Sequence, residues 1–152
     1  MDRIDVSVGS NGCFNGGDCA EVYESLQLYK EAIIAAEADI RNWPTNPLLL
    51  VQQHMAIGRC QVKLDQVQAA TDAFEAAIAE AHRCELPFLE MLARSDYIVH
   101  VLDKQGKRSS QMVALGRAIS KLALPGSEYA ATLGPDIDPE EAIRAFQSPP
   151  TL

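Results

Sequence analysis

The sequence has no long hydrophobic run and is poor in basic residues. No stretch approaches the ~18 consecutive apolar residues that a membrane-spanning helix needs, so no membrane partner is predicted. Thirteen Lys and Arg residues stand against 21 Asp and Glu, which gives a net charge of −8. A chain of this charge is repelled by a phosphate backbone, and nucleic acid is therefore excluded as the main partner.

A secretory signal is also lacking. The first ten residues, MDRIDVSVGS, contain no long apolar segment of the kind that a signal peptide needs. The proportions of hydrophobic and charged residues, 47% and 22%, are those of a soluble globular protein, and 152 residues fit one domain. We therefore expect a cytoplasmic protein.

Cysteine is scarce, with four residues at positions 13, 19, 60 and 84. The first two bracket CFNGGDC, which resembles a signature of epidermal-growth-factor-like modules. Such a module would need six cysteines within roughly 40 residues, and this window holds two, so we reject the resemblance. We expect residues 1–19 to be a flexible Gly/Asn-rich leader in which Cys13 and Cys19 are unpaired. Cys60 is predicted to be a small buried hydrophobe.

The rest of the chain has the apolar periodicity of helices and no alternation typical of strands. Breaks rich in proline separate the periodic segments. The predicted fold class is all-α, with five long helices and a short C-terminal helix in antiparallel hairpins, although a helix bundle would have the same periodicity. The predicted helices are 20–42, 47–64, 66–83, 87–104, 107–123 and 138–147.

Individual residues predict where some of these helices begin and end. Asn46 before Pro47 is a start signal, because it combines an N-cap oxygen with a proline in the first turn. Asp138 before Pro139 has the same form. Gly106 is a stop signal, since glycine adopts positive φ at little cost.

One segment, residues 54–78 (HMAIGRCQVKLDQVQAATDAFEAAI), resembles a tetratricopeptide unit. Ile57 and Gly58 match the large–small pair of that family's first helix. Ala70, Phe74 and Ala77 match the small–aromatic–small set of its second helix. Two helices that cross tightly need a missing side chain at their contact, beside a large one that fills the adjacent gap.

Two further segments resemble parts of the same unit. Residues 95–119 are a weaker copy of it, and YKEAIIAAEADIRNWP is similar to the second helix of a preceding unit. The spacings between the copies exceed the family's usual ~34 and resemble those of lengthened-helix variants. The resemblance implies a short superhelical stack of hairpins at 20–124, followed by a C-terminal extension at 125–152.

The resemblance also implies a function, because tetratricopeptide proteins are binding scaffolds whose first helices line a groove. We accordingly expect a non-enzymatic adaptor that binds a protein or peptide, with Tyr97 as the natural anchor. An ordinary solvated helix face is the alternative interpretation. The candidate groove residues are Gln52, Met55, Arg59 and Lys63 from the second predicted helix, and Asp96, Tyr97, His100 and Lys104 from the fourth.

Motifs of enzymes are absent from the sequence: it contains no H-E-x-x-H, no G-x-S-x-G and no P-loop. We therefore predict no catalytic residue, no metal site and no cofactor. Two alternatives stay open. One is a structural subunit of a larger assembly, held by the acidic face of the first helix and by the tail, and a stack this short could also complete itself as a homodimer. The other, which the residues favour less, is a metal-binding or redox protein.

Overall fold

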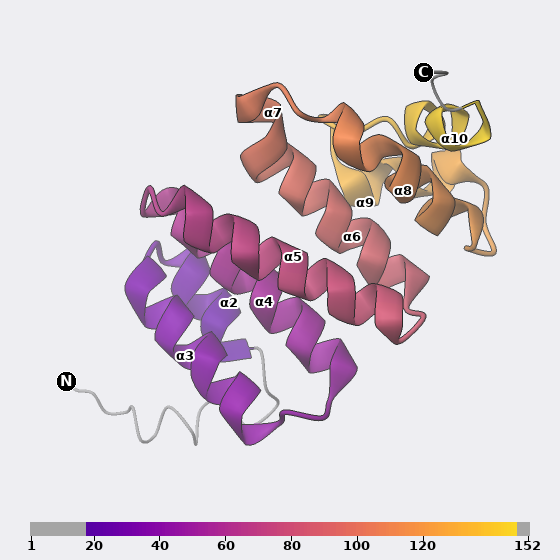
Figure 1. Cartoon of the computed structure of the whole chain (residues 1–152). Coiled ribbons are helices and arrows are strands. Elements are labelled where there is room, and N and C mark those ends of the chain that lie inside the picture. Colours follow the sequence, from indigo (N-terminus) through magenta and orange to yellow (C-terminus); the bar gives the residue numbers. More distant parts are fainter. Residues whose placement is uncertain (1–17, 149–152) are drawn as a thin grey trace. The chain divides into compact units, whose positions relative to one another are not determined.

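The computed structural model describes residues 18–148, and every regular element in that part of the chain is a helix (Figure 1). The predicted all-α class is therefore confirmed for the described residues. None of their helices is long and apolar enough to cross a membrane. The predicted leader lies outside this range except for Asp18 and Cys19, which belong to the first helix.

The chain divides into two compact units, Met1–Ala77 and Ile78–Leu152, and the division falls inside one helix, α5. The described part of the first unit holds α2 (Asp18–Ser25), α3 (Tyr29–Asn42), α4 (Pro47–Lys63) and the first turns of α5 (Val67–Arg83). The second holds the end of α5, α6 (Pro87–Tyr97), η1 (Ile98–Leu102), α7 (Asp103–Gln105), α8 (Ser109–Ser120), η2 (Gly126–Tyr129), α9 (Ala130–Leu133) and α10 (Pro139–Gln147).

The prediction of a single helix over 20–42 is wrong, because the chain turns between α2 and α3. Gln27 adopts a left-handed φ of 62°. Its N–H donates to the carbonyl of Glu24, and the N–H of Leu28 donates to the carbonyl of Tyr23, both at 2.9 Å. This pair of hydrogen bonds is a Schellman cap, which ends one helix and reverses the chain.

The apolar periodicity concealed this break. Val22 and Leu26 are in register with the apolar face of α3, and the sequence therefore indicates one continuous stripe. In the structure their side chains are 53% and 61% exposed. Periodicity reports the spacing of apolar residues and does not exclude a cap between them, since a cap also accepts residues other than glycine.

The same cap closes three further helices. Asp65, Glu85 and Gly106 have φ values of 60°, 56° and 68°. In each case the next residue donates its N–H to the carbonyl five positions earlier, at 2.8 to 2.9 Å. The caps at Gln27, Asp65 and Gly106 precede α3, α5 and α8 respectively, at nearly equal intervals along the chain. Three helix–turn–helix segments of similar construction therefore follow one another.

The helix that runs through α6, η1 and α7 contains one residue more than α4 before its cap. The stretch from Pro87 to the cap at Gly106 exceeds the stretch from Pro47 to the cap at Asp65 by that one residue. The π-helical segment η1 takes up the extra residue, because each i→i+5 hydrogen bond spans one residue more than an α-helical bond. Burial follows this register in the pairs Leu49/Leu89, Val51/Met91 and Ile57/Tyr97 before the segment, and in Cys60/Val101 after it.

Small residues let the helices of the first unit approach closely. A Cβ atom on Gly58 would lie 2.8 Å from the ring of Phe74, so α4 and α5 meet where a side chain is missing. Phe74 is fully buried, as the large–small pattern predicts. The core beside this contact consists of Ala20, Ala36, Ala56, Ile57 and Ala73, with Ile33, Ala35 and Ile40 packed against it.

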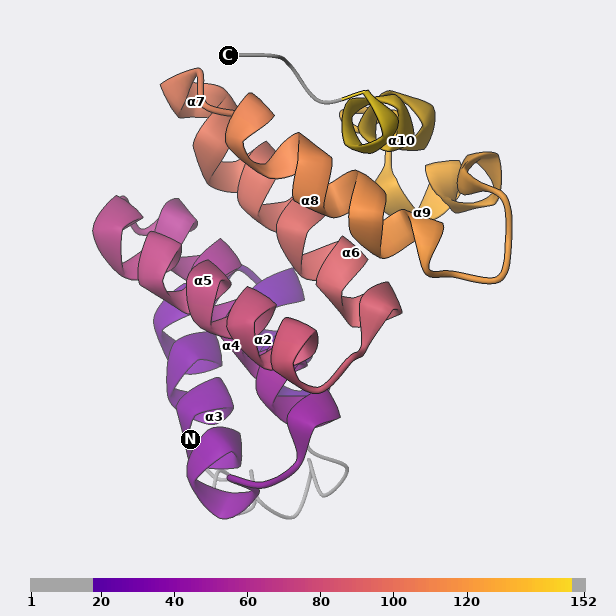
Figure 2. The ribbon, with the colours of Figure 1, turned by 45° about the vertical axis from the view of Figure 1, so that its right-hand side comes forward.

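In the second unit, α10 packs against α8, and Figure 2 shows the two helices next to each other. Gly116 is the point of closest approach, because a Cβ there would overlap the backbone of Ala142. The guanidinium of Arg117 lies 5.9 Å from the centre of the Phe146 ring. α10 begins as predicted, with the Asp138 carboxylate accepting a hydrogen bond from the N–H of Glu140 at 3.0 Å.

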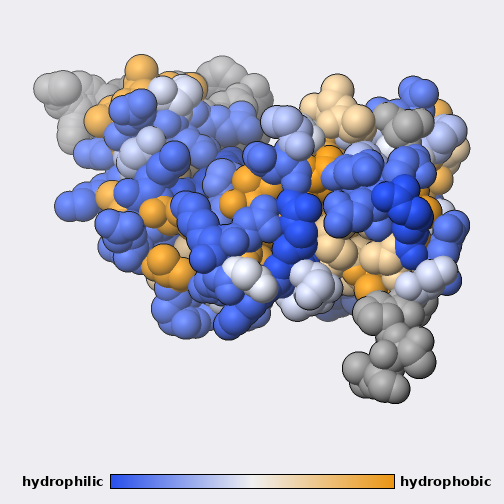
Figure 3. Space-filling view, turned by 90° about the horizontal axis from the view of Figure 1, so that it is seen from above, coloured by the Kyte–Doolittle hydropathy of each residue, from blue (hydrophilic) through white to orange (hydrophobic). Residues whose placement is uncertain are grey.

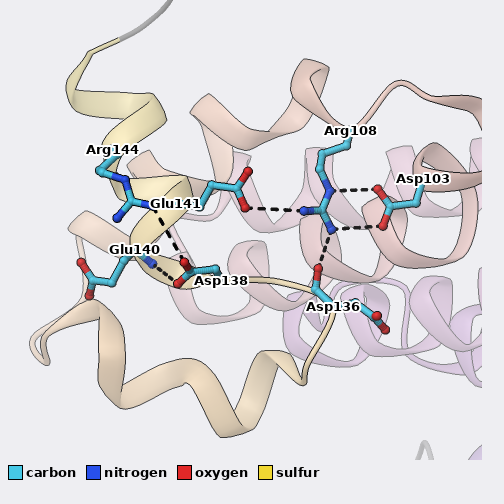
Figure 4. Close-up of polar contacts among 7 residues, drawn as sticks. All are labelled: Asp103, Arg108, Asp136, Asp138, Glu140, Glu141 and Arg144. Atoms are coloured by element: carbon cyan, nitrogen blue, oxygen red, sulfur yellow. Dashed lines mark hydrogen bonds and ion pairs between the residues drawn. The ribbon is translucent and has the colours of Figure 1, made fainter.

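Arg108 anchors the segment that leads into α10 (Figure 4). Its guanidinium donates to both carboxylate oxygens of Asp103, at 2.9 and 3.1 Å, and to the backbone carbonyl of Asp136. The carboxylate of Glu141 lies 3.5 Å away. The hydrogen bonds to Asp103 raise the pKa of Arg108 above the usual value of an arginine side chain. The described part of the predicted 125–152 extension is thus fastened to the last helical hairpin.

We predict that Gly58→Ala lowers the free energy of unfolding by about 1–3 kcal/mol, because the added methyl group forces α4 and the Phe74 ring apart. The measurement is urea unfolding, repeated in a Phe74→Leu background where the smaller side chain leaves room. The substitution should cost clearly less in that background. An equal loss in both backgrounds would show that this contact does not set the approach of the helices.

Candidate partner-binding site

The four predicted groove residues of α4 share one side of the helix, since they are spaced by three and four positions. Gln52 and Lys63 are exposed, and Arg59 is half-buried. Met55 lies between them and is 7% exposed. Three of these four side chains therefore reach solvent.

The other four predicted residues lie along the helix from α6 to α7. Lys104 is exposed, and Asp96 and His100 are half-buried. Tyr97, the predicted anchor, is only 6% exposed. The reason is its register: it precedes the extra residue of η1 and so occupies the position of the core residue Ile57. A partner could reach its ring only after this helix shifted.

His100 and Lys104 follow the extra residue and occupy the positions of Arg59 and Lys63. The π-helical segment therefore preserves the same spacing of polar side chains in both helices. Tyr97 lies before the extra residue, so it occupies a core position rather than a position on this polar face. This register is not visible in the sequence, because a one-residue insertion leaves the apolar pattern on both sides intact.

Arg59 and Lys63 line an open hollow whose other wall is α2. α2 ends at the Gln27 cap and lies against α4. The residues that complete the hollow are Glu21, Glu24, Ser25, Gln27 and Tyr29. The sequence analysis missed this wall because it placed α2 and α3 in one helix. The repeat spacing could have revealed this wall, because Gln27 lies one repeat before the turn residue Asp65.

A bidentate ion pair holds the hollow together. The guanidinium of Arg59 donates from two nitrogens to the two carboxylate oxygens of Glu24, at 2.8 and 3.0 Å. Both side chains are 23% exposed. Fork-to-fork pairing of this kind fixes geometry as well as charge, so it ties α2 to α4. The charges around it are the ammonium group of Lys63 and the carboxylate of Glu21.

Cys60 follows Arg59 and is completely buried, as predicted. Burial raises the pKa of its thiol to about 11, and the nearby carboxylate of Glu24 adds to the effect. A thiol with this pKa is protonated at neutral pH and is neither a nucleophile nor a ready metal ligand. Its role in the site is therefore packing.

The prediction that Cys19 is unpaired is wrong. Cys19 is disulfide-bonded, whereas Cys60 and Cys84 are free thiols. Cys13, the other half of the same prediction, lies outside the described residues. A pairing of this kind depends on the distance and direction between two side chains, which residue spacing alone does not determine.

The second unit contains a polar network around the buried side chains of Glu90 and Arg94, which the sequence analysis also missed. The carboxylate of Glu90 accepts a hydrogen bond from Arg94 at 2.8 Å and lies 3.3 Å from Nδ1 of His82. Arg94 also donates to the side-chain carbonyl of Gln111. His82 belongs to α5, Glu90 and Arg94 to α6, and Gln111 to α8. The network therefore joins these three helices. Its role is structural.

Metal chemistry receives no support from this geometry. Within residues 18–148, no group of three or more His, Cys, Asp or Glu side chains could hold a metal ion.

The chain was compared with known proteins, and no family model, no curated protein and no solved structure matches it.

The raised pKa of Cys60 predicts a pH-dependent contribution to stability. The pKa is about 11 in the folded state against 9.0 for a thiol in water, so burial of the thiol stabilises the fold fully below pH 9. This contribution, at most about 3 kcal/mol, is lost as the pH rises from 9 to about 11. We expect the stability difference between Cys84→Ser and Cys84→Ser/Cys60→Ala to shrink over that range.

The measurement is urea unfolding of both variants at several pH values from neutral to strongly alkaline. Cys84→Ser serves as the background because it removes the other free thiol of the described residues, and tyrosine and lysine titration is common to the two proteins. A difference that stays constant across the range would contradict the raised pKa.

Proposed function

We propose that this protein is a non-enzymatic interaction module with tetratricopeptide-like packing, which binds a peptide or a partner helix along the first helices of its hairpins. The observation that carries the proposal is the repeated hairpin. The caps at Gln27, Asp65 and Gly106 recur at nearly equal intervals, and the tight Gly58–Phe74 crossing lies inside the second hairpin. Repeated hairpins of this kind build binding surfaces from side chains of successive first helices.

The binding surface in the first unit is the hollow between α2 and α4, which are both first helices in this arrangement. Its ion pair holds the two walls in place before any partner arrives, which reduces the ordering that binding requires. Lys63 and Glu21 present one charge of each sign to a partner. In the second unit, Lys104 occupies the position equivalent to Lys63 and is exposed as Lys63 is.

The position of α10 fits this proposal. It covers the face of α8 at Gly116, where the helix of a further hairpin would otherwise pack. Its outer side carries polar residues, among them Glu141 and Gln147, which are exposed. A helix with one apolar and one polar side is what closes a stack of repeats and keeps its end soluble.

A second candidate function, assembly with another subunit, is favoured by one observation. Of the exposed large hydrophobic side chains in the described part of the chain, most lie between residues 22 and 48. These side chains lie on or beside α2 and α3 and at the first turn of α4, and a partner subunit that covered them would bury apolar surface. Figure 3 shows a face on which hydrophilic side chains predominate, with hydrophobic ones between them. Light scattering would distinguish an assembling subunit from a monomeric adaptor.

The proposal is tested by charge reversal on the first helices. Partners are first captured with the wild-type chain and identified by mass spectrometry, and their affinities are then measured. We expect the pair Lys63→Glu and Lys104→Glu to weaken binding at least about tenfold, because each reversal replaces an attraction with a repulsion. Circular dichroism should show that this variant is folded, since neither side chain is buried.

The matched control reverses two exposed lysines elsewhere, with Lys30→Glu on α3 and Lys121→Glu at the end of α8. The net charge of the control equals that of the test variant, so general electrostatics cancel in the comparison. Partners that bind the test variant as tightly as they bind the wild type would refute the proposal. An equal loss in both variants would refute it too.

A further inference from the structure

The first unit has a second open hollow, formed by the residues of three helices: α3, α4 and α5. Its floor is apolar. Ile57 is 6% exposed and Ala73 is 8% exposed, and Ile40 packs against the core cluster that includes both. Ala76 follows Ala73 by three positions on the same side of α5 and also lines the hollow. Because both alanines are small, they leave a space that a larger side chain could fill.

The rim of this hollow is charged. Glu37 on α3 and Asp72 on α5 contribute carboxylates from two walls. Asp72 accepts a hydrogen bond from Gln68 at 3.1 Å, which orients its carboxylate. Arg41 is also exposed at the rim. His54 on α4 lines the hollow as well. With its imidazole counted as neutral, two carboxylates against one guanidinium leave one negative charge, which attracts a cation more than an anion.

An exposed isoleucine stands beside the rim. Ile34 precedes Glu37 by three positions and Arg41 by seven on α3, so the three share one side of that helix. Its side chain is 64% exposed, the highest value among the exposed large hydrophobic side chains of the described residues. A partner that occupied the hollow and also covered Ile34 would bury additional apolar surface, which would add to the affinity.

We propose that this second hollow is a peptide-binding site, which takes an apolar side chain of a partner on its floor and a neighbouring basic side chain at Glu37 and Asp72. The occupant is defined by complementarity: an alkyl side chain matches the Ile57 and Ala73 floor, and a guanidinium or ammonium group matches the carboxylates. A single apolar anchor in a pocket, surrounded by polar contacts, is how small interfaces gain most of their affinity.

The site is distinct from the hollow between α2 and α4. It uses α3 and α5, which follow the caps, whereas the other is lined mainly by α2 and α4, which precede them. On α4 the two sites share no residue, because Ile57 lines one, and Arg59 and Lys63 line the other. Two separate sites would let the protein hold two partners at once.

The test uses a minimal probe, the blocked dipeptide acetyl-Leu-Arg-amide, titrated into the ¹⁵N-labelled full chain. We expect saturable chemical-shift changes at Ile40, Ile57, Ala73 and Ala76, with a dissociation constant of about 1 mM, as befits so small a ligand. The charge-reversed probe, acetyl-Leu-Glu-amide, should bind at least fivefold more weakly. No saturable change at these residues, or equal binding of the two probes, would overturn the proposal.

Two variants on one helix provide the control. Ala76→Arg places a long cationic side chain in the hollow and should abolish the shifts caused by acetyl-Leu-Arg-amide. Ala79→Arg makes the same chemical change at an exposed residue of α5 that does not line the hollow, and it should bind as the wild type does. An equal loss in both variants, or undiminished binding in Ala76→Arg, would contradict the site.

The pair Lys63→Glu and Lys104→Glu separates this inference from the proposed function. Those lysines do not line the second hollow, so that variant should bind acetyl-Leu-Arg-amide like the wild type. Loss of the dipeptide in that variant would show that the probe binds elsewhere and would overturn the inference.

Discussion

Each turn between consecutive helices at Gln27, Asp65, Glu85 and Gly106 depends on a single residue in the left-handed conformation. That conformation costs a residue other than glycine roughly 1–2 kcal/mol. Two backbone hydrogen bonds per turn satisfy carbonyl groups at the helix end and offset part of the cost. Because the cap reverses the chain within a few residues, the following helix returns beside the one that has just ended. The rest of the packing depends on this geometry.

Close packing of the returning helix then depends on small residues. Gly58 allows α5 to approach α4, and Gly116 allows α10 to approach α8. The core cluster beside the Gly58–Phe74 contact consists of four alanines and Ile57, so many small contacts add to the packing of the large Phe74 ring. The same choice leaves space over Ala73, which is 8% exposed, and over Ala76, which is half-buried. The hollow floored by Ala73 and Ala76 is therefore a consequence of how the helices pack.

Ion pairs fix the register between helices that packing of small residues leaves undetermined. Packing between alanine-rich faces has little preference for register, because such faces are smooth. The pair Glu24–Arg59 fixes α2 against α4, and Arg108 fixes the segment before α10 by contacts to Asp103, Asp136 and Glu141. A bidentate or multiply bonded guanidinium is suited to this role, since its donors have fixed directions. In the interaction module that we propose, the Glu24–Arg59 pair holds the two walls of the site in place.

The helical class, most helix boundaries and much of the core can be predicted from the sequence. The caps at Asn46 and Asp138, the stop at Gly106 and the burial of Gly58, Phe74 and Cys60 all follow from local chemistry and spacing. The turn at Gln27, the burial of Tyr97 and the wall that α2 provides are visible only in the folded structure. The local sequence does not predict these features. Left-handed caps accept several residue types. A one-residue π-helical insertion leaves the apolar pattern on both of its sides unchanged. Which residues meet across the hollow depends on contacts between distant segments, and these exist only once the chain has folded.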